Sequence, residues 1–301
     1  MSALRAIRIG TRGSALALWQ AHHVQARLGE LGHEVELRVI VTTGDRVLDR
    51  RLEDVGGKGA FLKEIEEAML AREVDLAVHS LKDVPTALPE GLALCAVLER
   101  ADPRDALLSR GRRLAELKEG AVVGTTSLRR QALLRALRPD LRLTDLRGNV
   151  DTRIRRLGEG AFDAILLAMA GLSRLGRSAE VTEALDPRAF VPAPGQGAIA
   201  LECRQDDAQV RAAVAALEHP ATARAVAAER AFLAELGGGC NVPLGAHAFA
   251  AGAELEMVGF VAARDGSTML RGEMRGAEAV ATGQKLAREL VSRGASRLLG
   301  N

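Results

Sequence analysis

Positive charge is concentrated in one stretch of this chain, between residues 124 and 156. Nine arginines and no lysine fall in that stretch, although the whole chain carries a formal net charge of only +2. Arginine presents a rigid fork of donors that matches a carboxylate or phosphate in two-point contact. Gly-Thr-Thr-Ser at 124–127 precedes a helical pattern, so hydroxyls and free backbone N–H groups gather at a helix N-terminus, where anions bind. We therefore predict a small ligand with several negative charges.

Cys240 follows three glycines at 237–239. Glycines remove the side chains before the thiol and permit unusual backbone angles, so the thiol can project into a cavity and react as a thiolate. A helix C-cap followed by a buried cysteine would have the same sequence. From the residues alone both interpretations stay open, and no Cys–His protease signature surrounds the motif.

Asp83 and its neighbour Lys82 come shortly after an apolar, strand-like segment at 74–78. A carboxylate at the end of a buried strand can hold a proton or stabilise a cationic intermediate, while a charged turn before Pro85 is the alternative. The glycine-rich segment 56–59 contains a lysine but lacks the spacing of a phosphate-binding P-loop. That segment is predicted to be a flexible loop entering a helix.

The composition excludes several classes of protein. With 48% hydrophobic and 27% charged residues the chain is typical of a globular protein. No apolar run is long enough to span a bilayer, and the first residues lack the pattern of an export signal, so we expect a cytoplasmic protein. One Trp, six Phe and no Tyr are too few for a nucleic-acid stacking platform, and the near-neutral charge disfavours phosphate-backbone binding.

The three cysteines, Cys95, Cys203 and Cys240, are odd in number and far apart in the sequence. This spacing argues against a disulfide framework and against a Cys-x-x-Cys metal site. We therefore expect neither a disulfide nor a metal.

Strand and helix signals alternate along the first part of the chain. Strands are predicted at 5–10, 34–41, 74–78, 92–98, 106–109, 121–123, 141–144 and 162–167, and helices at 14–31, 58–71, 127–137 and 150–157. The alternation predicts α/β units with mostly parallel sheets. In such sheets ligands bind beyond the carboxyl ends of the strands, which is where the arginines, hydroxyls and Asp83 occur.

Two segments, 99–104 and 191–197, have the composition of crossovers between lobes, and from about residue 206 the pattern changes. Helices at 206–216 and 220–236 lead to strands at 244–250, 254–262 and 268–275 and to a C-terminal helix at 277–299. This last part is predicted to be a separate α+β unit.

Eight sequence blocks, taken together and in this order, are specific. They are TRGSALA (11–17), GGKGAF (56–61), AVHSLKDVP (77–85), DPRD (102–105), VGTTSLRRQ (123–131), LRGNV (146–150), PGQGA (194–198) and GGCNVPLG (238–245). Over nearly its whole length the chain resembles the porphobilinogen deaminase family.

The resemblance implies an activity and a cofactor. The family condenses four porphobilinogens head to tail into hydroxymethylbilane with release of ammonia, starting from a dipyrromethane cofactor that a thioether joins to the cysteine matching Cys240. It also implies a fold of two lobes like those of periplasmic binding proteins, with mixed, mostly parallel sheets, plus a smaller C-terminal α+β domain. We expect lobe 1 at 1–98 with 195–216, lobe 2 at 99–194 and the cofactor-attachment domain at 217–301.

The resemblance assigns roles residue by residue. Asp83 matches the catalytic aspartate, which would stabilise the cation left when ammonia departs and serve proton transfer. The positions expected to bind substrate or cofactor are Arg12, Ser14, Lys58, Ser80, Lys82, Thr125, Thr126, Ser127, Arg129, Arg130, Arg147, Arg153, Arg174 and Gln196.

The family further suggests a monomer that passes its product to uroporphyrinogen-III synthase, with no nucleic-acid or membrane partner. A two-lobed binding protein for a small polycarboxylate is the alternative, since it would share the fold and the arginines. The absence of an export pattern and the Gly-Gly-Gly-Cys motif speak against that alternative. An anion-sensing regulatory domain would need a DNA-reading helix, for which the sequence gives no signal.

Overall fold

The structure is a computed structural model that describes residues 5–46, 62–237 and 242–299. Two predicted site residues, Lys58 and Cys240, lie outside the described residues, as does the glycine-rich segment 56–59. Within the described part no helix combines the length and apolar character needed to cross a membrane.

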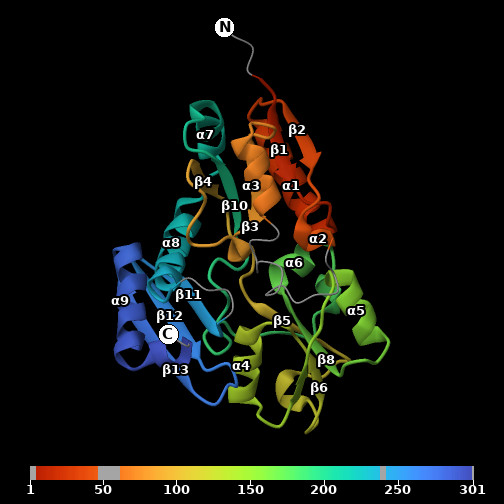
Figure 1. Cartoon of the computed structure of the whole chain (residues 1–301). Coiled ribbons are helices and arrows are strands. Elements are labelled where there is room, and N and C mark those ends of the chain that lie inside the picture. Colours follow the sequence, from red (N-terminus) through yellow and green to blue (C-terminus); the bar gives the residue numbers. More distant parts are fainter. Residues whose placement is uncertain (1–4, 47–61, 238–241, 300–301) are drawn as a thin grey trace. The chain divides into compact units, whose positions relative to one another are not determined.

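The first lobe is built on a five-stranded sheet in the order β2-β1-β3-β10-β4 (Figure 1). β1 pairs in parallel with β2 and β3, whereas β10 runs antiparallel to both β3 and β4. Four strands therefore point one way and β10 the other. The strands are β1 (Ile7–Thr11), β2 (Val35–Val39), β3 (Leu76–Ser80), β4 (Leu92–Val97) and β10 (Ile199–Arg204), and the helices are α1 (Ala15–Glu30), α2 (Thr43–Arg46), α3 (Lys63–Leu70), the 3₁₀ turn η3 (Leu81–Asp83) and α7 (Ala208–Ala215).

The second lobe repeats this plan with a sheet in the order β7-β6-β8-β5-β9. Here β5 is the reversed strand, again in fourth place, because it is antiparallel to β8 and β9 while β6 is parallel to β7 and β8. The elements are β5 (Asp105–Ser109), η4 (Leu114–Glu116), β6 (Val122–Gly124), α4 (Leu128–Leu137), β7 (Arg142–Thr144), α5 (Val150–Gly158), β8 (Ala164–Ala168), α6 (Met169–Arg174), η5 (Ser178–Glu180) and β9 (Glu183–Ala184). The predicted mixed, mostly parallel sheets are confirmed.

The C-terminal part is an antiparallel meander, β11-β12-β13, with helices packed against it. Its elements are α8 (Pro220–Glu235), β11 (Leu244–Ala251), β12 (Glu254–Ala262), β13 (Met269–Gly276), α9 (Ala279–Ser292) and α10 (Ala295–Leu299). The single helix predicted at 277–299 is wrong, because Gly294 has φ +101° and ends α9 in a left-handed conformation. The predicted α+β character is confirmed.

Contacts within the chain form two compact units, 1–100 with 198–223 and 101–197 with 224–301. The C-terminal meander has an apolar core of its own around Phe232 and Leu286. It also contributes Val258 and Phe260 to the core that contains β6 and α4. The three-domain division with boundaries at 98, 194 and 216 stays a prediction.

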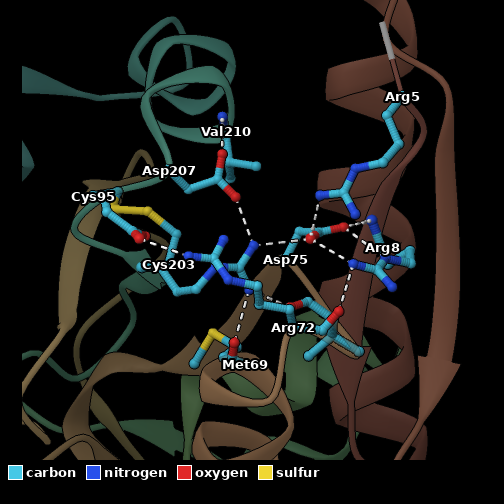
Figure 2. Close-up of polar contacts among 12 residues, drawn as sticks. Arg5, Arg8, Met69, Arg72, Asp75, Cys95, Cys203, Asp207 and Val210 are labelled. Carbon is cyan, nitrogen blue, oxygen red and sulfur yellow. Dashed lines mark hydrogen bonds and ion pairs between the residues drawn. A yellow bond between two sulfur atoms is a disulfide. The ribbon is translucent and has the colours of Figure 1, made fainter.

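A disulfide joins Cys95 on β4 to Cys203 on β10, with the Cα atoms 6.3 Å apart (Figure 2). The expectation that no disulfide forms is therefore wrong. The two cysteines are 108 residues apart in the sequence, but β10, a strand that the sequence analysis did not predict, returns from the second lobe to pair with β4. Distance along the chain was a poor guide to distance in space.

Asp75, just before β3, is fully buried and binds three arginines (Figure 2). Its carboxylate accepts hydrogen bonds from Arg5 at 2.6 Å, from Arg8 at 2.8 Å and from Arg204 at 2.9 Å. Burial alone would raise the pKa of Asp75, but the hydrogen bonds from these arginines and from the Arg8 backbone N–H hold it well below its ordinary value. This carboxylate therefore ties β1, β3 and β10 together.

Replacing Asp75 by Asn should lower the free energy of unfolding by about 3–5 kcal/mol, because three arginines lose the buried carboxylate that they share and Arg204 keeps only Asp207. Folding lowers the pKa of Asp75. The contribution of this carboxylate to the free energy of unfolding is therefore complete above the unfolded-state pKa of about 3.9 and is lost as the pH falls below that value. Urea denaturation at neutral pH and at pH 3 measures both effects. Asp206→Asn, whose exposed carboxylate pairs with Arg72, should cost less than about 1 kcal/mol; equal losses would contradict the assignment.

Candidate functional site

In the first lobe, the carboxyl ends of β1 and β3 place four predicted site residues around one pocket. β1 and β3 are parallel neighbours, so the loops that follow them emerge at the same edge of the sheet. Arg12, Ser14, Ser80 and Asp83 all line this pocket, a cavity of about 120 Å³. The sequence analysis predicted these residues from segments some 70 positions apart, and the sheet brings them together.

Backbone and side-chain hydrogen bonds fix the walls of the pocket. Ser14 is the N-cap of α1, where its side chain accepts a hydrogen bond from the Ala17 N–H. The Ser80 hydroxyl accepts a hydrogen bond of 2.8 Å from the Gln20 amide. Asp83 lies in the 3₁₀ turn η3, which is pinned to the returning chain because the Leu81 N–H donates to the Ala198 carbonyl at 3.0 Å.

Gln20 and His79 also line this pocket, and the sequence analysis did not assign either of them to the site. Gln20 is 2% exposed and shares the buried face of α1 with Val24 and Leu28. A polar residue on the apolar face of a predicted helix is a signal that would have found it. Lys82, next to Asp83, is half-buried in η3.

In the second lobe, Thr125, Thr126 and Ser127 follow β6 and lead into α4 as predicted. Ser127 is the N-cap of α4 and accepts a hydrogen bond from the Arg130 N–H. The Thr125 hydroxyl, which is buried, accepts one of 3.2 Å from the Ser127 N–H. The Thr126 hydroxyl donates to the Leu146 carbonyl at 3.5 Å. These hydroxyls therefore shape the helix N-terminus as well as offering donors there.

Arg129 and Arg130 have a partner that the sequence analysis did not anticipate. Each is 6% exposed, and both bind the fully buried carboxylate of Asp105, at 2.7 Å in each case. They also donate to the carbonyls of Val191 and Leu166. Burial would raise the pKa of Asp105, but the charges of the two arginines hold it well below its usual range.

Gln196, another predicted ligand-binding residue, joins the same network. Its amide is 1% exposed and donates to the Pro103 carbonyl at 2.7 Å and to Asp105 at 3.2 Å. In this structure Asp105 therefore receives hydrogen bonds from three predicted binding residues. Their contact with ligand carboxylates stays a prediction.

The guanidiniums of Arg153 and Arg174 are in a different electrostatic environment from those of Arg129 and Arg130. Burial lowers the pKa of each guanidinium to about 10, and the charge of Arg130 adds to the effect at Arg153. Arg153 donates to the Gly148 carbonyl and Arg174 to the Gly197 carbonyl, both at 2.7 Å. No carboxylate among the described residues forms an ion pair with Arg153. A desolvated cation of this kind is stabilised when a ligand brings a carboxylate to it.

The residues of the second lobe therefore fit a ligand that carries several carboxylates. The guanidiniums of Arg153 and Arg174, the N-terminus of α4 and half-buried Arg147, which follows β7, supply charge and donors. Within the described ranges there is no group of three or more histidine, cysteine or acidic side chains arranged to hold a metal ion.

Comparison with protein families gives two matches that together span most of the chain. The model for the porphobilinogen deaminase dipyromethane cofactor binding domain matches residues 7–212, and the model for the porphobilinogen deaminase C-terminal domain matches residues 223–292. Among curated proteins, porphobilinogen deaminase from Syntrophobacter fumaroxidans is 53% identical over 300 residues, covering 98% of this chain and 97% of that protein. The protein of the same name from Pelobacter propionicus is 52% identical over 299 residues, covering 98% and 96%.

Among solved structures, a periplasmic substrate-binding protein of an ABC transporter from Coxiella burnetii covers 74% of this chain and 96% of its own. Its TM-score is 0.44 and its sequence identity 17%.

The contrast between Arg129 and Arg153 is testable by unfolding. Arg129→Gln should lower the free energy of unfolding by about 3–5 kcal/mol, because it breaks a buried ion pair. Arg153→Gln removes a desolvated cation without a carboxylate partner and should change that free energy by no more than about 0.5 kcal/mol. Urea titrations of the two variants measure the difference. The reverse order would show that Arg153 is the structural arginine.

Proposed function

The chain belongs to the porphobilinogen deaminase family, and we propose that Asp83 and Cys240 divide the chemistry of its reaction between them. The protein is a hydroxymethylbilane synthase: it condenses four porphobilinogen molecules head to tail into hydroxymethylbilane and releases ammonia, starting from a dipyrromethane cofactor. The observation that supports the proposed roles most directly is the pocket in which Asp83 lies with Arg12 and Ser80.

Cys240 is the proposed attachment point of the cofactor. Of the three cysteines, Cys95 and Cys203 are bonded to each other, so Cys240 is the thiol left for a thioether. The three residues before Cys240 are glycines, which have no side chains. When bound, the cofactor supplies the nucleophilic pyrrole carbon that receives the first substrate unit.

Asp83 is the proposed catalytic residue. Porphobilinogen loses ammonia from its aminomethyl group, which leaves a cation delocalised over the pyrrole ring and its nitrogen. A fixed carboxylate within reach of that N–H stabilises the developing charge, and it can accept a proton afterwards. The 3₁₀ turn η3 holds Asp83 at the pocket wall, so the carboxylate does not have to reorganise as the charge forms.

The arginines are proposed to bind substrate and cofactor carboxylates. Each pyrrole carries an acetate and a propionate, so every addition brings two more negative charges into the site. Arg153 and Arg174 are desolvated cations suited to this purpose. The other groups proposed to contact carboxylates or the cofactor are Arg12, Ser14, Lys58, Ser80, Lys82, Thr125, Thr126, Ser127 and Arg147.

Arg129, Arg130 and Gln196 are proposed to act from positions that their hydrogen bonds to Asp105 fix. Their bonds to Asp105 hold the N-terminal turn of α4 against β5 and β8, and any remaining donors can meet a ligand at that turn. A binding protein for a small polycarboxylate could have the same arrangement of arginines around a buried carboxylate. Neither the family matches nor the curated relatives favour that alternative.

We further propose that the enzyme acts as a monomer in the cytoplasm and passes its linear product to uroporphyrinogen-III synthase.

A Cys240→Ser protein should lack the mass increment of two pyrrole units that the native protein carries, because a hydroxyl does not form the thioether. Intact-protein mass spectrometry of the freshly purified proteins measures the increment. Cys95→Ser is the matched control and should retain it. A native protein whose mass equals that of its translated residues would contradict the attachment.

An Asp83→Asn protein should fold normally and carry the cofactor, but its kcat should fall by about 10²–10⁴-fold, the range that positioned acid–base groups contribute. The amide keeps the shape of the side chain and loses the negative charge. Colorimetric assay of product formation, with circular dichroism as the folding control, measures the effect. Asp206→Asn, on the surface of the same lobe, should keep native activity; a fully active Asp83→Asn enzyme would remove the assignment.

A further inference from the structure

A buried polar cluster lies beneath helix α3 in the first lobe. One face of β3 and β10 is apolar and packs in the core with α1 and α7, through residues such as Val78 and Leu201. Side chains alternate across a strand, so His79 and Glu202 point to the opposite face, which α3 covers with Ile65 and Met69 packed on β3.

Three titratable side chains meet in this cluster: His79 from β3, Glu202 from β10 and Glu66 from α3. The His79 imidazole and the Glu202 carboxylate are hydrogen-bonded, with Nε2 and Oε2 2.9 Å apart. Glu202 is completely buried, and Glu66 and His79 are 9% and 8% exposed. One oxygen of each glutamate, Oε1, is buried without a hydrogen-bond partner.

The charge in the cluster is not balanced. Two carboxylates face one imidazole, and the next cation on that face of β10, Arg204, is bound by Asp75 and Asp207, while its Nε is buried without a partner. Burying an ionised carboxylate oxygen without a donor is costly, whereas a protonated oxygen is neutral and donates. Burial and the charge of Glu202 raise the pKa of Glu66, and His79 opposes them less strongly.

The cluster opens onto the site through His79, which lines the same pocket as Asp83, Arg12 and Ser80. These are the charged and polar groups that face His79 from η3, β1 and its own strand, while Glu66 and Glu202 face it from α3 and β10. His79 is thus placed between the buried carboxyl groups of Glu66 and Glu202 and the pocket that Asp83 lines.

The reaction needs a place to hold one proton in each cycle. The C–N bond of the substrate's ammonium-bearing methylene breaks, and its electron pair leaves with ammonia. A C–C bond forms from the α-carbon of the receiving pyrrole, whose C–H bond then breaks; the electron pair returns to the ring and the proton goes to a base. The released ammonia takes up one proton and departs as ammonium. A proton is therefore in transit between the C–H bond that breaks and the ammonia that leaves.

We propose that Glu66, Glu202 and His79 form a buried proton-holding cluster that exchanges this transit proton with Asp83. The inference rests on the proposed role of Asp83. Because the three act through Asp83, they are positioning residues: Glu202 orients His79, and Glu66 stores a proton in the resting enzyme.

Glu66→Gln provides the test in the cofactor-loaded enzyme, because glutamine reproduces the shape and neutrality of protonated Glu66 but cannot release a proton. We expect kcat to fall by about 100-fold, the lower end of what positioned proton transfer contributes, with KM unchanged and an altered pH profile of kcat. Glu67→Gln, the neighbouring exposed residue on α3, is the matched control and should behave as the native enzyme. A purely structural Glu66 would tolerate the change, so native kcat in Glu66→Gln would overturn the proposal.

A second readout does not depend on activity. Infrared difference spectra of the resting holoenzyme between neutral and alkaline pH should show the C=O stretch of one protonated carboxyl group, which is absent from Glu66→Gln and present in Asp83→Asn. The same band in both Glu66→Gln and the native protein would overturn the proposal. If Asp83→Asn were fully active while the band behaved as expected, the failure would lie in the role of Asp83 and not in the proton on Glu66.

Discussion

Ion pairs in which one buried carboxylate serves two or more arginines govern how this protein is organised. Asp105 alone faces Arg129 and Arg130 in a fully buried environment, and Asp75 faces Arg8 and Arg204. Removing a charge from water is costly unless a partner compensates it. The arginines that these two carboxylates compensate stabilise each lobe from within.

The two lobes carry opposite imbalances. In the second lobe Arg153 and Arg174 are desolvated cations. In the first lobe Glu66 and Glu202 leave carboxylate oxygens buried without donors near the pocket of Asp83. In the proposed function, the cations of the second lobe suit the binding of acetate and propionate groups, and the buried acids of the first lobe suit the handling of a transient cation and its protons.

Parallel strands bring charged residues from distant parts of the sequence together. Because neighbouring parallel strands end at the same edge, Arg12 after β1 meets Asp83 after β3. The reversed strands β10 and β5 play a different part: Glu202 and Arg204 on β10, and Asp105 on β5, supply the buried charges beneath these sites. Each lobe thus carries predicted ligand-binding residues after its forward strands and buried charges on its reversed strand.

The sequence by itself determined the alternating elements and the family, because these depend on local spacing and on short blocks of residues. It also showed the arginine-rich stretch, and the family resemblance made Asp83 a candidate. Only the tertiary structure decided which arginines are compensated, because Asp105 lies 24 residues from Arg129. The disulfide, with cysteines 108 residues apart, and the His79–Glu202 pair, 123 residues apart, likewise depend on β10, whose return to the first sheet no local pattern specifies.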